Sequence, residues 1–261
     1  MTQPIVRAID VGFGNTKFIA LKNGGDLHCG LFPSIAPTAS SSVDLSVGMF
    51  QRRNTISVKV GNVSYEVGKD ARLAQDANYV RVLDQSFPMT DSYIALIRGA
   101  LHYMAVPHVD YLVVGLPMNN FEGCRVALED RIRGIHHIPA SDGSMRAIEV
   151  RNVRVLPQPI GALFDYSNHK EHFQRIRSQM NLIVDPGYYT LDWVVAHGVK
   201  VVSSRSGASS GGMSAVLAAI GEAVERELGV QLNSYSAIDD ALRLGTPARF
   251  FGKDFDLTPF L

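Results

Sequence analysis

Short apolar runs separated by turn residues dominate the hydrophobic pattern of the chain. Such runs are rich in β-branched residues and are bounded by Gly, Pro, Asn or Asp, which is typical of strands. We predict strands at residues 5–9, 16–21, 27–32, 56–60, 63–67, 111–116, 148–156, 182–184, 191–197 and 199–203, with buried runs at 111–116 and 182–184. Asn23-Gly24-Gly25 and Gly61-Asn62 are placed to form hairpin turns.

A second pattern, with apolar residues three and four positions apart, predicts helices. Helices are expected from Thr90 or Asp91 to Met104, at 121–133, at 160–166, and at 213–228. Thr90 or Asp91 can cap the first of them, and Gly229 is placed to end the last. The mixture of strands and helices along the chain predicts α/β layers.

Two segments rich in Ser, Gly or Pro have less regular patterns. Residues 33–48 contain two prolines and a serine run, and we expect them to form a loop or mobile insert. Residues 203–214 could be a flexible linker or a Gly-rich turn. In the second case the turn leads into the helix at 213–228, whose first N–H groups would be free to face a phosphate.

The most informative feature is an internal match between residues 9–19 and 184–194. Each copy has an apolar strand, then Asp-x-Gly and an aromatic residue, and then a second apolar strand. The aspartates of the two copies, Asp10 and Asp185, are 175 residues apart, which is far beyond the period of a solenoid repeat. The match predicts two related half-domains that each begin with the same hairpin.

The repeated hairpin has a chemistry that suits phosphate. An aspartate at a strand end lies where α/β proteins bind ligands, and glycine lets backbone N–H groups approach phosphate oxygens. Two carboxylates repel a bare phosphate but can hold it through Mg²⁺, which needs only one or two of them. A single Asp-x-Gly is usually just a turn, but the duplication favours two turns that grip a polyphosphate from both sides.

Composition narrows the class of protein. Of the 261 residues, 46% are hydrophobic and 19% are charged, which is typical of a globular protein, and the formal net charge is zero. A neutral chain gives no electrostatic reason to expect direct binding to nucleic acid or to an acidic membrane. With two cysteines, no signal-peptide pattern and no apolar run of about 20 residues, we expect a cytoplasmic protein.

Three motifs follow one another along nearly the whole chain, at residues 9–17, 156–162 and 184–192, and Gly211-Gly212-Met213 then opens a predicted helix. In this order they resemble the phosphate and connecting motifs of the superfamily of actin, Hsp70 and sugar kinases. Within it they are most similar to the ParM/StbA group of bacterial plasmid-segregation ATPases. The resemblance implies an α/β, actin-like (ribonuclease H-like) fold with two lobes and a duplicated β-hairpin phosphate-binding unit.

The resemblance also implies roles for individual residues. Asp10 and Asp185 would bind Mg²⁺ through water, Lys17 would neutralise phosphate charge, and Gln158 would orient the attacking water. Asp185, Gln158 and Asp10 would thus be the catalytic residues of ATP hydrolysis. Nucleotide or phosphate contacts are expected from Gly12, Phe13, Gly14, Asn15, Thr16, Lys17, Gly187, Tyr188, Tyr189, Thr190, Gly211, Gly212 and Met213.

At the level of the whole protein, the resemblance implies a slow Mg²⁺-dependent ATPase that assembles with itself into filaments and moves plasmid DNA through a DNA-bound adaptor protein. ATP and GTP both remain open as the nucleotide. The lobes are expected at residues 1–165, with an insert around 33–90, and at 166–261. The family continues into an adenosine motif with two glycines that has no counterpart after Asp239, so we expect the second lobe to be incomplete at its C-terminus.

Some residues depart from the family pattern and leave other functions open. Pro186, Tyr188 and Tyr189 replace smaller residues, and proline removes an N–H donor. One alternative is a filament or cell-shape scaffold that does not hydrolyse nucleotide, and another is a small-molecule kinase of the same superfamily. The pair His136-His137 could suggest a metal, but adjacent side chains converge poorly on one ion, so we expect surface histidines.

Overall fold

The computed structural model describes residues 3–21, 27–39, 53–74, 82–140, 144–168, 170–232 and 234–261. The chain divides into two compact units. The first consists of Met1–Asp185 and Asp192–Ala208, and the second of Pro186–Leu191 and Ser209–Leu261. The lobe boundary predicted at residue 166 stays a prediction.

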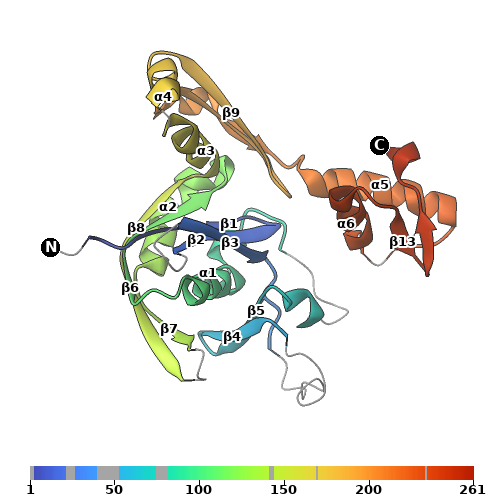
Figure 1. The fold of residues 1–261 in the computed structure, drawn as a ribbon, viewed down its shortest axis with the longest axis horizontal. Helices are drawn as coiled ribbons and strands as arrows, with labels where there is room; N and C mark the ends of the chain where they lie inside the picture. The colour runs from blue at the N-terminus through green and yellow to red at the C-terminus, as the bar shows by residue number, and fades with distance from the viewer. Residues whose placement is uncertain are drawn as a thin grey trace. The chain divides into compact units, whose positions relative to one another are not determined.

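A six-stranded mixed sheet is the centre of the first unit (Figure 1). Its strands lie in the order β3 (Leu27–Pro33), β2 (Asn15–Leu21), β1 (Val6–Val11), β6 (His108–Leu116), β8 (Met145–Pro157) and β7 (Gly134–Pro139). β1, β6 and β8 are parallel to one another, whereas β2, β3 and β7 run antiparallel to their neighbours. The apolar pattern predicted all of these strands except β7, which is interrupted by two histidines.

The helix α1 (Asp91–Met104) packs against β1 and β2 and begins as the sequence predicts. The hydroxyl of Thr90 accepts a hydrogen bond from the N–H of Tyr93 at 3.2 Å, which caps the helix. The helix ends at Ala105, a non-glycine residue in the left-handed region with φ 52°. A second helix, α2 (Met118–Ile132), packs against β8 and β6 and starts three residues earlier than predicted.

A separate hairpin of β4 (Thr55–Val60) and β5 (Val63–Gly68) packs against α1. Gly61 supplies the left-handed conformation of its turn at φ 57°, so this predicted hairpin is confirmed. The short 3₁₀ helices η1 (Ala71–Ala74) and η2 (Phe87–Met89) follow it along the chain.

Two of the predicted loops fall wholly or partly outside the described residues. The turn at Asn23-Gly24-Gly25 lies outside them, although β2 and β3 on either side of it pair as predicted. Of the loop predicted at 33–48, residues 33–39 are described. Ile35 and Ala36 in this stretch are buried, so it packs into the core rather than projecting as a mobile insert.

A smaller sheet follows the six-stranded one along the chain. Its strands are β9 (Met180–Pro186), β10 (Leu191–His197), β11 (Lys200–Val201) and β12 (Gly207–Ser209), and β10 pairs with each of the others. The helices α3 (Gln158–Ser167) and α4 (Lys170–Ile176) pack on it through an apolar cluster of Ile160, Leu163, Ile176, Val194 and Ala196. Because part of the segment 203–214 forms β12, this segment is not a flexible linker.

The strand predicted at 182–184 is present within β9 but is not buried. The side chains of Leu182 and Val184 are 65% and 53% exposed, whereas Ile183 packs against the apolar cluster of α3, α4 and β10. A strand whose residues are all apolar has no polar face in its sequence. Its pattern therefore cannot show that only one face is covered.

The second unit is built on two helices and a hairpin. They are α5 (Met213–Leu228), α6 (Ser236–Leu244), β13 (Ala248–Phe250) and β14 (Lys253–Phe255), followed by the 3₁₀ helix η4 (Thr258–Phe260). The core consists of Leu217, Ile220, Val224, Ile238, Ala241, Ala248, Phe250 and Leu257. α5 ends as predicted at Gly229, which adopts the left-handed conformation at φ 67°.

The two adjacent histidines lie in β7, and one of them corrects the sequence prediction. His136 is buried, with 3% of its surface exposed, whereas His137 is exposed. The Nε2–H of His136 donates to the carbonyl oxygen of Ile132 at 2.6 Å, and Nδ1 accepts from Arg98 Nε at 3.4 Å. Burial lowers the pKa of His136, which favours the neutral imidazole in the core.

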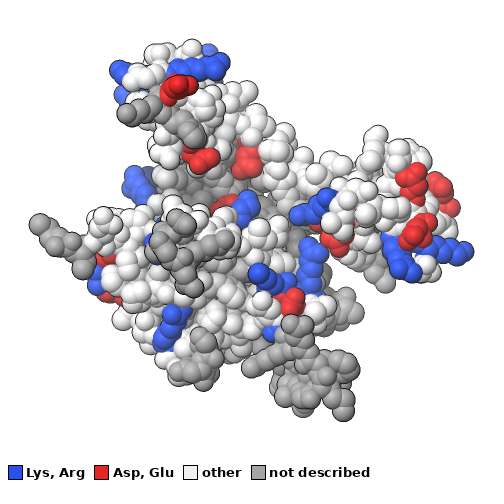
Figure 2. Space-filling model, in the orientation of Figure 1, with Lys and Arg blue, Asp and Glu red and all other residues white. Residues whose placement is uncertain are grey.

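The surface carries acidic and basic side chains in small groups that are interspersed on the face seen in Figure 2. Over the whole sequence the 25 basic and 25 acidic residues balance. Within the described ranges, no helix is both long and apolar enough to cross a membrane.

Candidate functional site

The internal repeat of the sequence is present as two hairpins with the same backbone turn. In the β1–β2 hairpin, the N–H of Gly12 donates to the carbonyl oxygen of Asn15 at 3.2 Å. In the β9–β10 hairpin, the N–H of Gly187 donates to the carbonyl oxygen of Thr190 at 2.9 Å. Each residue of the first turn lies 175 positions before its counterpart in the second. The duplication therefore extends from the sequence to the hydrogen bonding of the backbone.

Both turns leave little space for a side chain at the position of the motif glycine. A Cβ on Gly12 would lie 3.3 Å from the carbonyl oxygen of Asn15, and one on Gly187 would lie 2.9 Å from that of Thr190. The second distance is shorter than real Cβ contacts, so a side chain there would force the turn open. The second turn thus needs its glycine, whereas a side chain at Gly12 would only tighten the contact in the first turn.

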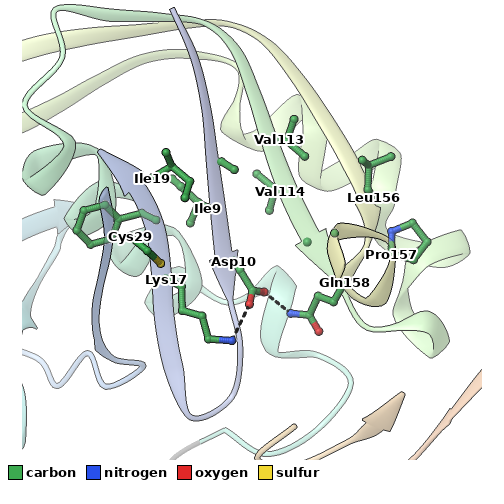
Figure 3. Close-up of a pocket in the computed structure, with 14 residues that line it drawn as sticks. Ile9, Asp10, Lys17, Ile19, Cys29, Val113, Val114, Leu156, Pro157 and Gln158 are labelled. Atoms are coloured by element: carbon green, nitrogen blue, oxygen red, sulfur yellow. Dashed lines mark hydrogen bonds and ion pairs between the residues drawn. The ribbon is translucent and has the colours of Figure 1, made fainter. Parts of the chain in front are cut away.

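Asp10, near the end of β1, is the centre of a polar cluster with Lys17 and Gln158 (Figure 3). Its Oδ2 lies 3.2 Å from Lys17 Nζ, across the β1–β2 hairpin. Its Oδ1 accepts a hydrogen bond from Gln158 Nε2, at the start of α3, at 2.6 Å. The side chains of Asp10 and Lys17 are 35% and 56% exposed, so the pair can reach a ligand from solvent.

Gly115, which the sequence analysis missed, makes room for this polar cluster. It lies directly opposite Asp10 in the parallel pairing of β1 with β6. A Cβ on Gly115 would be 2.8 Å from Gln158 Cγ and 3.2 Å from Asp10 Oδ1. A signal was available in the sequence, because a glycine inside a strand often marks the close approach of another group.

The polar cluster lines a cavity of about 240 Å³. Its other walls come mainly from apolar side chains of the sheet, among them Ile9, Ile19, Val113 and Val114 (Figure 3). Typical pockets for small molecules have volumes of roughly 300–1,000 Å³ and apolar walls with a few polar groups. This cavity has that composition and is large enough for part of such a ligand.

Asp185, the counterpart of Asp10 in the second hairpin, is half-buried and has a raised pKa. Burial is the main cause, the negative charges of Asp10 and Asp192 add to it, and the positive charge of Lys17 opposes it. Asp185 belongs to the same unit as Asp10, and their charges interact. Raised carboxyl pKa values of this origin are common at functional sites.

Comparison with known proteins identifies the family. A sequence profile described as the Actin like proteins N terminal domain matches residues 8–161, which is more than half of the chain. This chain belongs to the actin-like proteins. No curated protein sequence matches it.

Solved structures of other actin-like proteins share its fold at low sequence identity. The archaeal actin homolog Ta0583 in complex with ADP is 21% identical, with a TM-score of 0.71, and the match covers 98% of this chain and 77% of that one. A ParM filament from Clostridium botulinum is 20% identical, with a TM-score of 0.74, and the match covers 99% and 79%. The actin-like protein Alp7A is 15% identical, with a TM-score of 0.70, and the match covers 98% and 74%. The predicted actin-like α/β fold is thereby confirmed.

Two residues of this actin-like protein that were predicted to contact nucleotide or phosphate have side chains buried in the core. Phe13 is buried and its ring stacks on Phe87, with the centroids 5.2 Å apart. Thr16 is also buried, and its Oγ1 lies 2.9 Å from Ser34 Oγ. The N–H of Ser34 in turn donates to the carbonyl oxygen of Gly14 at 3.0 Å. Phe13 and Thr16 can therefore contribute to a ligand site only through their backbone.

The second turn caps α5, which corrects the prediction that the start of this helix has free donors. The N–H groups of Gly212, Met213 and Ser214 donate to the carbonyl oxygens of Tyr189, Gly187 and Tyr188 at 3.0, 3.0 and 2.7 Å, respectively. A Cβ on Gly212 would lie 2.6 Å from the carbonyl carbon of Tyr189, so glycine permits this contact. These donors therefore already have acceptors within the protein.

The remaining residues predicted around the second turn mainly build the fold. Tyr188 packs against the core of the second unit, and Tyr189 is half-buried. Thr190 is buried, with 5% of its surface exposed. Gly211 lies just before α5, where an added Cβ would meet only Ser209 Oγ at 3.7 Å. The polar cluster around Asp10 is consequently the most complete part of the candidate site.

Proposed function

We propose that this actin-like protein binds ATP together with Mg²⁺ and hydrolyses it slowly. The observation that carries the proposal is the polar cluster of Asp10, Lys17 and Gln158, with the raised pKa of Asp185 in the same unit. The archaeal actin homolog Ta0583, which shares this fold, has been solved in complex with ADP, and this supports a nucleotide as the ligand. GTP is the competing nucleotide, and the experiment includes it.

The acidic residues of this site suit Mg²⁺. This ion takes oxygen ligands, keeps several waters, and is usually held by one or two carboxylates together with phosphate oxygens. Asp10 and Asp185 supply two carboxylates. Burial raises the pKa of Asp185 and repulsion from Asp10 adds to this shift, and a divalent cation would relieve the repulsion. When bound, Mg²⁺ would neutralise charge on the phosphates.

The tasks around Asp10 are then divided among three side chains, those of Lys17, Gln158 and Asp185. Lys17 carries an exposed ammonium that can neutralise phosphate oxygens. Gln158 uses its amide N–H for Asp10, so its Oε1 is the end that can accept a hydrogen bond from water. Burial, the main cause of the raised pKa of Asp185, makes this carboxylate a better proton acceptor than an ordinary aspartate. Positioning and charge stabilisation of this kind are the main needs of phosphoryl transfer.

We further propose that the bound nucleotide controls assembly of this protein into filaments, which segregate plasmid DNA in the cytoplasm through a DNA-bound adaptor protein. The support is the fold shared with a ParM filament from Clostridium botulinum and with Alp7A. Direct contact with DNA or a membrane is not part of the proposal.

Three measurements on the whole chain test the proposal. They are the binding of fluorescent ATP and GTP analogues with and without Mg²⁺, the release of phosphate, and light scattering by filaments. We expect Mg²⁺-dependent binding and slow phosphate release in the wild type, and the loss of phosphate release in Asp10→Ala and Asp185→Ala. Asp165→Ala, which removes an exposed carboxylate on α3, is the matched control and should behave as the wild type.

Each alternative function has its own outcome in these measurements. Scattering without phosphate release indicates a scaffold, and phosphate transfer that requires a second small substrate indicates a kinase. Normal hydrolysis by both aspartate variants would show that the site is wrongly assigned. Failure of the wild type to bind either nucleotide would contradict the proposed function as a whole.

A further inference from the structure

Asp192 is a buried carboxylate at the position of the repeat where the first hairpin has Lys17. Lys17 follows Asp10 by seven residues, and Asp192 follows Asp185 by the same number. Lys17 is more than half exposed and pairs with Asp10, whereas only 2% of the surface of Asp192 is exposed. A carboxylate removed from water in this way needs a hydrogen-bond donor within the protein.

The donor is the first N–H of α2. Asp192 Oδ1 accepts a hydrogen bond from the N–H of Met118 at 2.7 Å, across 74 residues of sequence. The N-cap residue of α2 is Pro117, which offers no side-chain hydrogen bond to the helix. The first N–H groups of a helix have no acceptor within it, and a carboxylate at this end is also favoured by the helix dipole. Asp192, in β10 of the smaller sheet, therefore caps α2, which packs on the six-stranded sheet.

The capped start of α2 lies close in sequence to Gly115, which contacts the polar cluster of Asp10, Lys17 and Gln158. Met118 follows Gly115 by three residues, and Gly115 lies opposite Asp10 and against Gln158. The side chain of Met118 also packs on the apolar cluster that joins α3 to β10, and α3 begins with Gln158. Met118 therefore connects the start of α2 both to the end of the strand that carries Gly115 and to the cluster that supports the helix of Gln158.

We propose that Asp192 is a positioning residue for the Asp10–Gln158 pair, because it fixes the start of α2 and thereby the place of Gly115 beside that pair. The effect of Asp192 on catalysis rests on the proposed function, whereas its hydrogen bond to Met118 does not.

Amide hydrogen exchange of the whole chain tests this hydrogen bond without any ligand. We expect the Met118 amide to be protected in the wild type and to exchange at least about ten-fold faster in Asp192→Ala. Asp192→Asn keeps an acceptor oxygen and should retain most of the protection. An unprotected Met118 amide in the wild type would overturn the proposal, whether or not the variants fold.

Asp110→Ala is the matched control, because Asp110, like Asp192, accepts a hydrogen bond from a backbone N–H that is distant in the sequence. Asp110 Oδ2 accepts the N–H of Ile5 at 2.7 Å, and Asp110 also pairs with Arg151, so it is a structural residue outside the polar cluster. This variant should lose stability but leave the exchange of the Met118 amide unchanged. Faster exchange at Met118 in Asp110→Ala would reveal a general loosening of the fold and would overturn the specific role of Asp192.

Phosphate release gives a second readout that a purely structural residue would not change. Asp192→Ala should lower kcat at least about ten-fold with less than about a three-fold change in KM, because Lys17 and the first turn still bind the phosphates. Asp192→Asn should restore most of the rate. Equal losses of kcat in Asp192→Ala and Asp110→Ala would overturn the positioning role. If the wild type neither binds nor hydrolyses nucleotide, the proposed function fails, and exchange at Met118 still decides the role of Asp192.

Discussion

Gln158 Nε2 donates a hydrogen bond to Asp10 Oδ1 at 2.6 Å, although the two residues are 148 positions apart in the sequence. The bond connects the end of the first strand to the first turn of α3. It also orients the amide, since only its N–H end can bond to a carboxylate. The position of the Gln158 oxygen is therefore set before any ligand binds.

Gln158→Ala should lower the rate of phosphate release at least about ten-fold, because it removes the group that orients the attacking water. Nucleotide affinity should change much less, since the carboxylates and Lys17 remain. The measurement is phosphate release beside the binding of a fluorescent nucleotide. Gln174→Ala, at an exposed position on α4, is the control. A wild-type rate in Gln158→Ala would remove this residue from the mechanism.

Gly115→Ala should destabilise the protein by about 1–3 kcal/mol and separate Gln158 from Asp10, because the added Cβ would lie 2.8 Å from Gln158 Cγ. Gly123→Ala is the matched control within α2, where no atom lies within 4 Å of the added Cβ. It should stabilise the protein by up to about 1 kcal/mol, since alanine is a better helix former. Urea unfolding measures both changes, and similar effects of the two substitutions would contradict the close contact at Gly115.

Asp185→Asn should raise the stability of the ligand-free protein at pH 7, while abolishing Mg²⁺-dependent binding. The pKa of Asp185 is raised above its usual value of 3.8, mainly by burial, so the fold favours the uncharged carboxyl. That contribution is fully present below about pH 3.8 and is lost as the pH rises through the raised pKa.

Thermal unfolding of Asp185→Asn and the wild type should consequently coincide in acid and diverge toward neutral pH, with the variant more stable. Asp165→Asn, at an exposed position on α3, is the control for removing one negative charge. A variant less stable than the wild type at pH 7 would show that the carboxylate of Asp185 is favourable in the fold.

His136→Phe should lower stability at pH 7.5 by about 1–3 kcal/mol, because it leaves the carbonyl oxygen of Ile132 without its donor. It should also weaken the pH dependence of folding. Burial holds the pKa of His136 below its usual value of 6.5, so its stabilising effect is complete above about pH 6.5 and is lost on acidification. Urea midpoints between pH 7.5 and 5 measure this, with the exposed His137→Gln as the control. An unchanged pH slope in His136→Phe would show that another group dominates it.

Gly212→Ala should destabilise the second unit by at least about 2 kcal/mol, because the added Cβ would meet backbone atoms of the second turn at 2.6–2.8 Å. Gly211→Ala meets only Ser209 Oγ at 3.7 Å and should be nearly neutral. Hydrogen exchange along α5 reports the difference. Equal exchange in the two variants would argue against the tight contact between the turn and the helix.

The elements that could be predicted are those whose local signals agree with their packing. α1 is the clearest case, since Thr90 caps it and its apolar stripe, which includes Tyr93 and Leu101, is buried. The β4–β5 hairpin was predictable for a similar reason, because Gly61 fits the turn that its strands need. In both cases the deciding interactions lie within a few residues of one another.

The elements that were missed depend on distant partners. β7 contains a buried histidine, which became acceptable in the core only through Arg98 and the carbonyl oxygen of Ile132. The first donors of α5 were wrongly predicted to be free, because their acceptors lie more than twenty residues earlier in the second turn.

The residues of the candidate site also fall into two groups, those that the sequence predicted and those that only the structure revealed. The motifs predicted Asp10, Lys17 and Gln158, and the structure brings these three together. Gly115 carries only the general signal of a glycine inside a strand, and Asp192 carries only its place in the internal match. Their importance comes from contacts with Gln158 and Met118, which the order of residues along the chain does not reveal.

The hydrogen bonds between the start of α5 and the turn of the β9–β10 hairpin affect how a movement of the turn would displace the helix. Three hydrogen bonds join residues 187–189 to the start of this helix, so a change in the turn is passed directly to the helix. α5 has 16 residues and is therefore about 24 Å long at 1.5 Å per residue. A tilt of about 5° at the turn would displace the far end of such a rod by roughly 2 Å. A small change in the orientation of the hairpin tip would thus become a larger displacement at the far end of α5, next to Gly229.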